Sequence, residues 1–279
     1  MSIGATREPQ PASTANPTVP AQSGTRFLLL NSAVAFALAL MTMVTLHELA
    51  HAVTALSLGL NATLHSGSVY VPNYRSDSER ITTALAGPFF SLISGLLILA
   101  LPRFGRGFWR LFVMWLGLLS VQEFVGYLMT APFVTFGDIG QALRLAGAPF
   151  WTFILSFLLG LAGMFLLGRA ATRRLLEFTR EGTDSISDQL SSLGLFAWLL
   201  GVLAVIVLGA GSDSLSRDGL FELAGGISSG IFLVFVRLVM KGALVRGQGL
   251  VAGWPVVGMV LVVLFSIFRH FVLGPGIPL

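Results

Sequence analysis

The chain has 279 residues, of which 54% are hydrophobic and 11% charged, and its mean hydropathy is +0.83. A soluble globular domain could not cover its surface with so few charges, so this composition predicts a polytopic membrane protein. The formal net charge is only +4 and no basic stripe is interleaved with aromatic residues, which argues for the lipid bilayer and against nucleic acid as a partner. Because the chain has no cysteine, disulfides and thiolate metal ligands are excluded.

The succession of apolar runs predicts an all-α fold with about six to seven transmembrane helices. Residues 1–25 are rich in Pro, Ser, Thr and Ala and predict a flexible tail. A secretory signal peptide is the competing interpretation of this tail and the first run, but we find no persuasive cleavage site and expect the helix to be retained. We expect a membrane-embedded core at 26–148 and accessory transmembrane helices at 149–279. The expected spans are 27–59, 81–101, 111–131, 149–168, 193–209, 219–240 and 250–272.

The sequence His47-Glu48-Leu49-Ala50-His51 lies near the far end of the first apolar run. In a helix, residues four apart share one face with their Cβ atoms about 5–6 Å apart, so the two imidazoles can turn towards a common point. Imidazole is a good zinc ligand, and Glu48 can take a proton from zinc-bound water, so the motif predicts a hydrolytic zinc centre. The alternative is that these polar residues only close a transmembrane helix. We favour the zinc centre because ionisable groups near a membrane helix are costly and usually functional.

The residue types alone leave the third ligand open. His65 lies in the segment 61–80, where β-favouring residues and turn residues predict a short strand or hairpin near the site. We expect His65 to be a solvated loop residue rather than a ligand. Glu123 lies within the third span, and Asp138 stands between two glycines after a proline break. For Asp138, the competing role is that of a helix N-cap.

Several of these stretches together resemble the site-2 protease family of intramembrane zinc metalloproteases. They are HELAH, the HAVTALSLG sequence that continues from it, Ala86-Gly87-Pro88 in the second span, and Gly137-Asp138-Ile139-Gly140 after the third. The resemblance covers residues 27–145. Ser91 stands where the family often has Asn, and Thr130 and Pro132 remain from an Asn- and Pro-rich segment.

The resemblance implies that His47, His51 and Asp138 bind one Zn²⁺ per chain and that Glu48 is the general base. It also implies cleavage of membrane-embedded or membrane-proximal protein substrates. We favour Asp138 over Glu123 as the third ligand because the preceding helix break and flanking glycines let its backbone approach the first helix. Glu123 is suited to a hydrogen bond with a ligating imidazole. The candidates for supporting the ligands or positioning the substrate are Glu123, Ser91, Gly87, Pro88 and His65.

Two functions from other classes are alternatives. A catalytically silent zinc-binding scaffold, or pseudoprotease, would keep the ligands and recruit partners through the C-terminal helices, but the intact Glu48 favours an enzyme. A transporter is disfavoured because the ionisable residues within the spans are few and lie around the motif. The pair Gly226 and Gly230 is typical of a helix-packing face and only sometimes indicates a homo-oligomer. The strand around Val69–Val71 could hold an unwound substrate by edge pairing.

The distribution of basic residues predicts the orientation of the chain in what we expect to be the cell membrane. With seven spans, twelve Lys and Arg fall on the N-terminal side and five on the other. The positive-inside rule then puts the N-terminus in the cytoplasm and HELAH nearer the outer face. The family resemblance favours instead a site that is reached from the cytoplasm.

Overall fold

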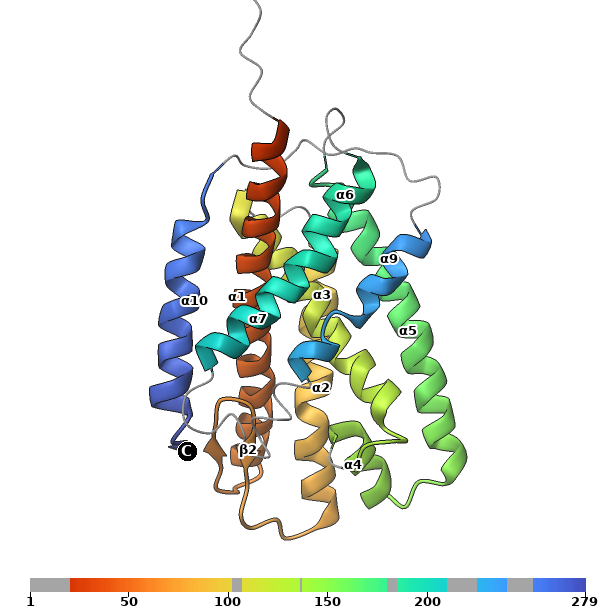
Figure 1. Cartoon of the computed structure of the whole chain (residues 1–279). Helices are drawn as coiled ribbons and strands as arrows, with labels where there is room; N and C mark the ends of the chain where they lie inside the picture. Colours follow the sequence, from red (N-terminus) through yellow and green to blue (C-terminus); the bar gives the residue numbers. More distant parts are fainter. Residues whose placement is uncertain (1–20, 102–106, 136, 180–184, 210–224, 240–252) are drawn as a thin grey trace, which may run out of the picture.

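The computed structural model of the chain describes residues 21–101, 107–135, 137–179, 185–209, 225–239 and 253–279. The fold is that of an all-α polytopic membrane protein, as the sequence predicts, with one small sheet at the end of the helix bundle (Figure 1). Among the described residues, six helices are long and apolar enough to cross a membrane: Arg26–Ser57, Asp77–Ala100, Gly107–Thr130, Phe150–Leu176, Ile186–Leu208 and Val256–Leu273.

These spans overlap six of the seven expected ones, and their ends differ from the expected bounds by up to eight residues. Residues 1–20 of the expected tail lie outside the described residues, and the first helix already begins at Ala21. The sixth expected span, 219–240, is described only in part, as the shorter apolar stretch Gly225–Val236. The helices are α1 Ala21–Ser57, α2 Asp77–Ala100, α3 Gly107–Thr130, α4 Asp138–Leu145, α5 Phe150–Leu176, α6 Ile186–Ser191, η1 Ser192–Phe196, α7 Ala197–Gly209, η2 Ile231–Leu233, α9 Val234–Val239, α10 Val256–Phe268 and η3 Arg269–Leu273.

Helix α1 is the central element, because it packs against α2, α3, α7 and α10 (Figure 1). Its sequence contains no proline or glycine between Phe27 and Leu58, so nothing interrupts the backbone hydrogen bonds. It ends at Gly59, whose φ of +71° is readily adopted by glycine. The Gly59 N–H donates to Leu56 O and the Leu60 N–H to Ala55 O, which is the Schellman arrangement of a helix end. HELAH therefore lies in the last third of a rigid helix.

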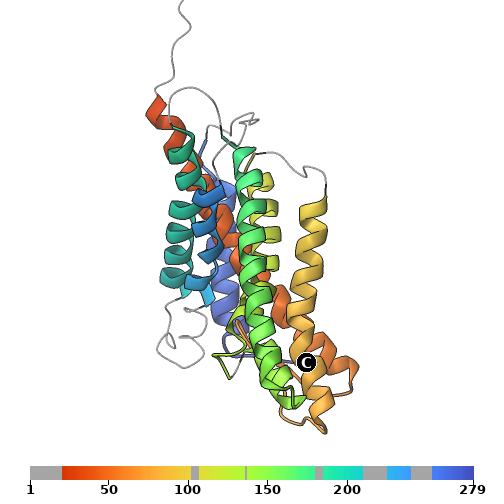
Figure 2. The ribbon, with the colours of Figure 1, turned by 90° about the vertical axis from the view of Figure 1, so that its right-hand side faces the viewer.

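Helix α2 stands at the edge of the bundle with its N-terminal half beside the end of α1 (Figure 2). It begins at Ser76, whose hydroxyl accepts a hydrogen bond from the Glu79 N–H at 3.2 Å. Glycine lets α2 approach α3 closely, since a Cβ at Gly95 would lie 2.8 Å from the backbone nitrogen of Val121. The three helices α1, α2 and α3 thus form one packed unit around the motif.

The expected β-like segment is confirmed as a three-stranded antiparallel sheet at the end of the bundle that carries α4. Strand β1 (Thr63–Leu64) lies in the middle, between β2 (Val69–Tyr70) and β3 (Ile277–Pro278). The register pairs Leu64 with Val69 on one side and with Ile277 on the other. The third strand, from the C-terminal part of the chain, is not foreseen by the sequence reasoning.

The glycine pair in the second half of the chain packs within the same chain. A Cβ at Gly230 would lie 2.3–2.5 Å from the indole of Trp198 in α7, and one at Gly226 would touch Val202. The pair therefore serves as a helix-packing face, which is the role that such a motif most often has.

Candidate metal centre

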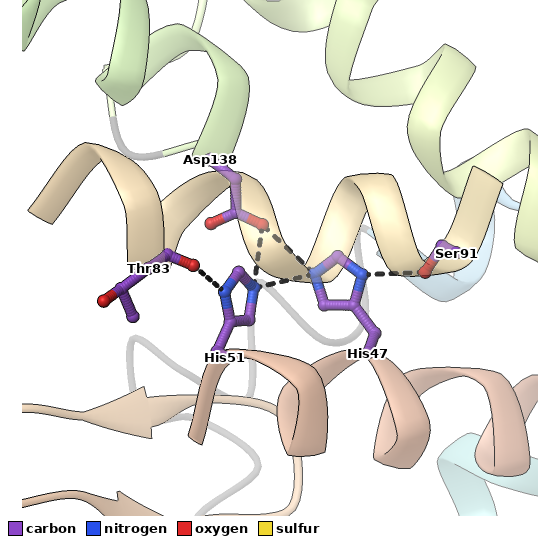
Figure 3. A network of polar contacts seen from close by, with 5 residues as sticks. All are labelled: His47, His51, Thr83, Ser91 and Asp138. Carbon is purple, nitrogen blue, oxygen red and sulfur yellow. Dashed lines mark hydrogen bonds and ion pairs between the residues drawn. The ribbon is translucent and has the colours of Figure 1, made fainter. Parts of the chain in front are cut away.

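His47 and His51 lie one turn apart on the face of α1 that is turned towards α2, and both side chains are buried. Their ring centroids are 4.7 Å apart and their Nε2 atoms 3.1 Å apart (Figure 3). The helical spacing of HELAH therefore brings both imidazoles to a common point, as the sequence predicts.

Asp138 brings a carboxylate to the same point from another part of the chain. Its Oδ2 lies 3.1 Å from His47 Nε2 and 3.2 Å from His51 Nε2 (Figure 3). Gly137, with extended backbone angles, is the N-cap of α4, and Asp138 is the first residue of that helix. The competing interpretation of Asp138 as a helix N-cap is therefore wrong.

The position of α4 depends on glycine and arginine contacts with the preceding segment. A Cβ at Gly140 would lie 3.0 Å from both Ala131 O and Val134 O, so a side chain here would push the two segments apart by a few tenths of an ångström. Arg144 Nη2 donates to Ala131 O at 3.0 Å. These contacts hold the start of α4 against the end of α3.

The outer nitrogen atoms of the two imidazoles are bound by α2. His47 Nδ1 lies 3.1 Å from Ser91 Oγ, and His51 Nδ1 lies 2.7 Å from Thr83 O. A backbone carbonyl can only accept a hydrogen bond, so Nδ1 of His51 carries the hydrogen and Nε2 of the neutral ring presents a lone pair. Such a contact fixes the tautomer and the orientation of a metal-ligating histidine.

Gly87 makes room for the two histidines on the facing side of α2. A Cβ at this position would lie 2.3 Å from His51 Nε2 and 2.6 Å from His47 Nε2. Gly87 and the following Pro88 are both buried within α2. Gly87 therefore borders the candidate site and gives the ligand atoms their space.

The three converging atoms fit a metal ion in both distance and charge. Zinc bonds of roughly 2.0–2.1 Å at tetrahedral angles of about 109° require ligand atoms about 3.3–3.4 Å apart. The observed separations are 3.1, 3.1 and 3.2 Å. Two imidazole nitrogens and one carboxylate oxygen, turned towards one another, are a donor set that a cation stabilises. His47, His51 and Asp138 could therefore bind a metal ion.

The electrostatic surroundings keep Asp138 ionised. Burial raises the pKa of its carboxyl group, but without a metal ion the charge of a protonated His51 and the hydrogen bonds that both imidazoles then donate lower it further. The net effect is a pKa well below the ordinary range of an aspartate. A metal ligand must be deprotonated, so this carboxylate is in the required form at neutral pH.

Two further acidic residues lie near this cluster. Glu48 is buried on α1 within electrostatic range of both histidines and Asp138. Glu123, on α3, is a charged neighbour of His47 and Asp138. The nitrogen atoms of the two histidines bind Ser91, Thr83 and Asp138 instead, so the structure does not show the hydrogen bond expected between Glu123 and a ligating imidazole.

Tyr127, one turn after Glu123, stacks on His47 and was missed by the sequence reasoning. Its spacing of four residues from Glu123, which puts both on one helix face, is the signal that could have found it.

His65 does not belong to the cluster. It follows β1, and its Nδ1 lies 3.4 Å from Gly274 O, beside the turn that leads into β3. The expectation that His65 is a loop residue rather than a ligand agrees with this position. Comparison with protein-family models, with curated proteins and with solved structures found no match to this chain.

Proposed function

We propose that the chain is a zinc-dependent intramembrane endopeptidase of the site-2 protease type, which hydrolyses membrane-embedded or membrane-proximal protein substrates in the cell membrane. The observation that carries this proposal is the convergence of His47 Nε2, His51 Nε2 and Asp138 Oδ2 to within 3.1–3.2 Å at the apolar helix that bears HELAH. A largely buried carboxylate is costly without a partner, and a dication is the strongest partner available.

The donor set supports zinc as the ion. Zinc is bound in catalytic sites by three protein ligands of the imidazole and carboxylate type, with the fourth position left for water or substrate. His47, His51 and Asp138 would hold the ion. When bound, zinc lowers the pKa of its water to about 7 and polarises a carbonyl group.

The chain itself supplies the groups that move protons and orient the ligands. Glu48 accepts the proton of the attacking water and donates it to the leaving amine, a role that contributes about 10²–10⁴-fold in rate. Its place in the motif, next to a ligand but outside the ligand set, leaves its carboxylate free for this task. Ser91 and the Thr83 carbonyl keep the imidazoles turned towards the ion.

The small sheet offers an edge along which an extended peptide substrate could bind. Amide bonds inside a helix are shielded, so a transmembrane substrate must unwind before it is cut. Both edges of β1 are occupied, by β2 and β3, so the outer edges of β2 and β3 are the edges to which a peptide could pair. Tyr70 of β2 is 61% exposed, so this strand is accessible. An extended segment could add to it through backbone hydrogen bonds.

The test is cleavage of membrane-embedded substrates by the purified chain in lipid vesicles, with Glu48→Gln as the variant. We expect Glu48→Gln to keep one zinc per chain and to lose at least about 100-fold in rate, because only proton transfer is removed. Glu79→Gln is the matched control, since Glu79 pairs with Arg75 at the start of α2. Cleavage by Glu48→Gln at the wild-type rate would reject the proposal. Zinc binding by a wild-type chain that cleaves nothing would favour the scaffold.

A further inference from the structure

Tyr127 contacts two elements that carry the candidate ligands. Its ring lies on the imidazole of His47 with the centroids 5.6 Å apart and the planes within 14°, so the two rings are stacked. This places a residue of α3 directly against a ligand of α1.

The other contact of Tyr127 is with the start of α4. A Cβ at Gly137 would lie 3.4 Å from Cδ1 and 3.6 Å from Cε1 of the tyrosine, so the backbone just before Asp138 passes the edge of the ring with room for about one methyl group between them. The phenol group is also close enough to the Asp138 carboxylate for their charges to interact. One side chain therefore spans the gap between His47 and Asp138.

The choice of tyrosine at this position indicates that the hydroxyl group is used. The chain has 22 phenylalanines and only 3 tyrosines, so phenylalanine is its ordinary aromatic residue. A hydroxyl group buried in a membrane helix without a partner would destabilise the fold. At Tyr127 the Asp138 carboxylate is a charged neighbour that could accept this hydrogen bond.

We propose that Tyr127 is a positioning residue of the metal centre. Its ring fixes the plane of the His47 imidazole and the separation between α1 and the start of α4, and its hydroxyl donates to the Asp138 carboxylate. A ligating carboxylate that also accepts such a hydrogen bond cannot rotate away from the ion. This inference rests on the metal centre of the proposed function but not on protease activity.

The test compares Tyr127→Phe, which keeps the ring and removes the hydroxyl, with Tyr127→Leu, which removes both. Zinc affinity is measured by competition with a chelator, and the ligand geometry by the visible absorption of the cobalt-substituted protein. We expect Tyr127→Phe to weaken zinc binding by about 10–100-fold, as is typical when a partner of a metal ligand is lost. Tyr127→Leu should weaken binding more, and both variants should change the cobalt spectrum, which a purely structural aromatic residue would not do.

Tyr70→Phe is the matched control, because Tyr70 is exposed on β2 and its variant should bind zinc as the wild type does. A Tyr127→Phe variant with wild-type zinc affinity and an unchanged cobalt spectrum would overturn the role of Tyr127 alone. A wild-type chain that binds neither zinc nor cobalt would overturn the metal centre itself and this role with it.

Discussion

Replacing Gly87 with alanine adds one methyl group at the most crowded point of the candidate metal centre. The new Cβ would lie 2.3 Å from His51 Nε2, 2.6 Å from His47 Nε2 and 2.7 Å from His51 Cε1. Ordinary contact between such atoms needs about 3.5 Å, so the imidazoles would have to retreat by about 1 Å. Because both rings are also bound by α2 through Ser91 and Thr83, this retreat would break those contacts.

A displacement of this size is incompatible with metal binding. Zinc–imidazole distances vary by only about 0.2 Å in functional sites, so a shift of about 1 Å in two ligands removes them from the ion. We expect Gly87→Ala to lower zinc affinity by more than the 10–100-fold that follows from losing a supporting hydrogen bond. The metal-free fold should lose some stability through the broken contacts with Ser91 and Thr83, at about 1–3 kcal/mol each, offset in part by the preference of about 1 kcal/mol for alanine over glycine within a helix.

The assay is zinc affinity by chelator competition, with the thermal stability of the metal-free protein measured in parallel. Gly225→Ala is the control, because a methyl group there would meet nothing within 4 Å. Wild-type zinc affinity in Gly87→Ala would refute the reasoning. A metal-free variant that no longer folds would also contradict it, since the methyl group would then have disrupted the helix packing and not only the ligand positions.

Three further predictions concern the ligands and the orientation. His47→Ala and His51→Ala should each reduce zinc from one per chain to background in elemental analysis, and full occupancy in both would reject the site. In zinc titrations, Asp138→Ala should abolish binding, while Glu123→Gln, which removes a nearby charge but no hydrogen bond of a ligand, should weaken it by less than the 10–100-fold typical of losing such a bond; the reverse ranking would exchange their roles. The charge distribution predicts that the loop after α1 faces the outside of the cell, so the single cysteine of an Asn73→Cys variant, at an exposed position, should react with an impermeant reagent on intact cells. Protection of this cysteine until the cells are opened would place the loop in the cytoplasm.

The parts of the site that could be predicted from the sequence are those set by local geometry. The pairing of His47 with His51 needs only the helical repeat, and the apolar run around them fixes their surroundings. The contact between Asp138 and His47 joins residues 91 positions apart. Spacing alone could not choose among Asp138, Glu123 and His65 as the third ligand. The resemblance to a family selected Asp138, and the structure brings it to the histidines while Gly137 takes the N-cap.

The unforeseen parts depend on distances between helices or on the backbone. The Thr83 carbonyl that binds His51 is a group that every residue offers, so the residue type carries no signal for it. The space that Gly87 leaves for the ligands becomes visible only when α2 is packed on α1. Strand β3 has two residues, too few to show an alternating pattern, and its pairing with β1 joins distant parts of the chain.

The most direct test of the metal centre is X-ray absorption at the zinc edge of the purified wild-type protein, combined with its zinc content. We expect one zinc per chain, bound by nitrogen and oxygen at about 2.0–2.1 Å, with the outer-shell scattering of two imidazole rings. The His51→Ala variant should lose this signal. Zinc well below one per chain in protein supplied with the metal, or a spectrum with no imidazole contribution, would contradict a centre built from His47, His51 and Asp138.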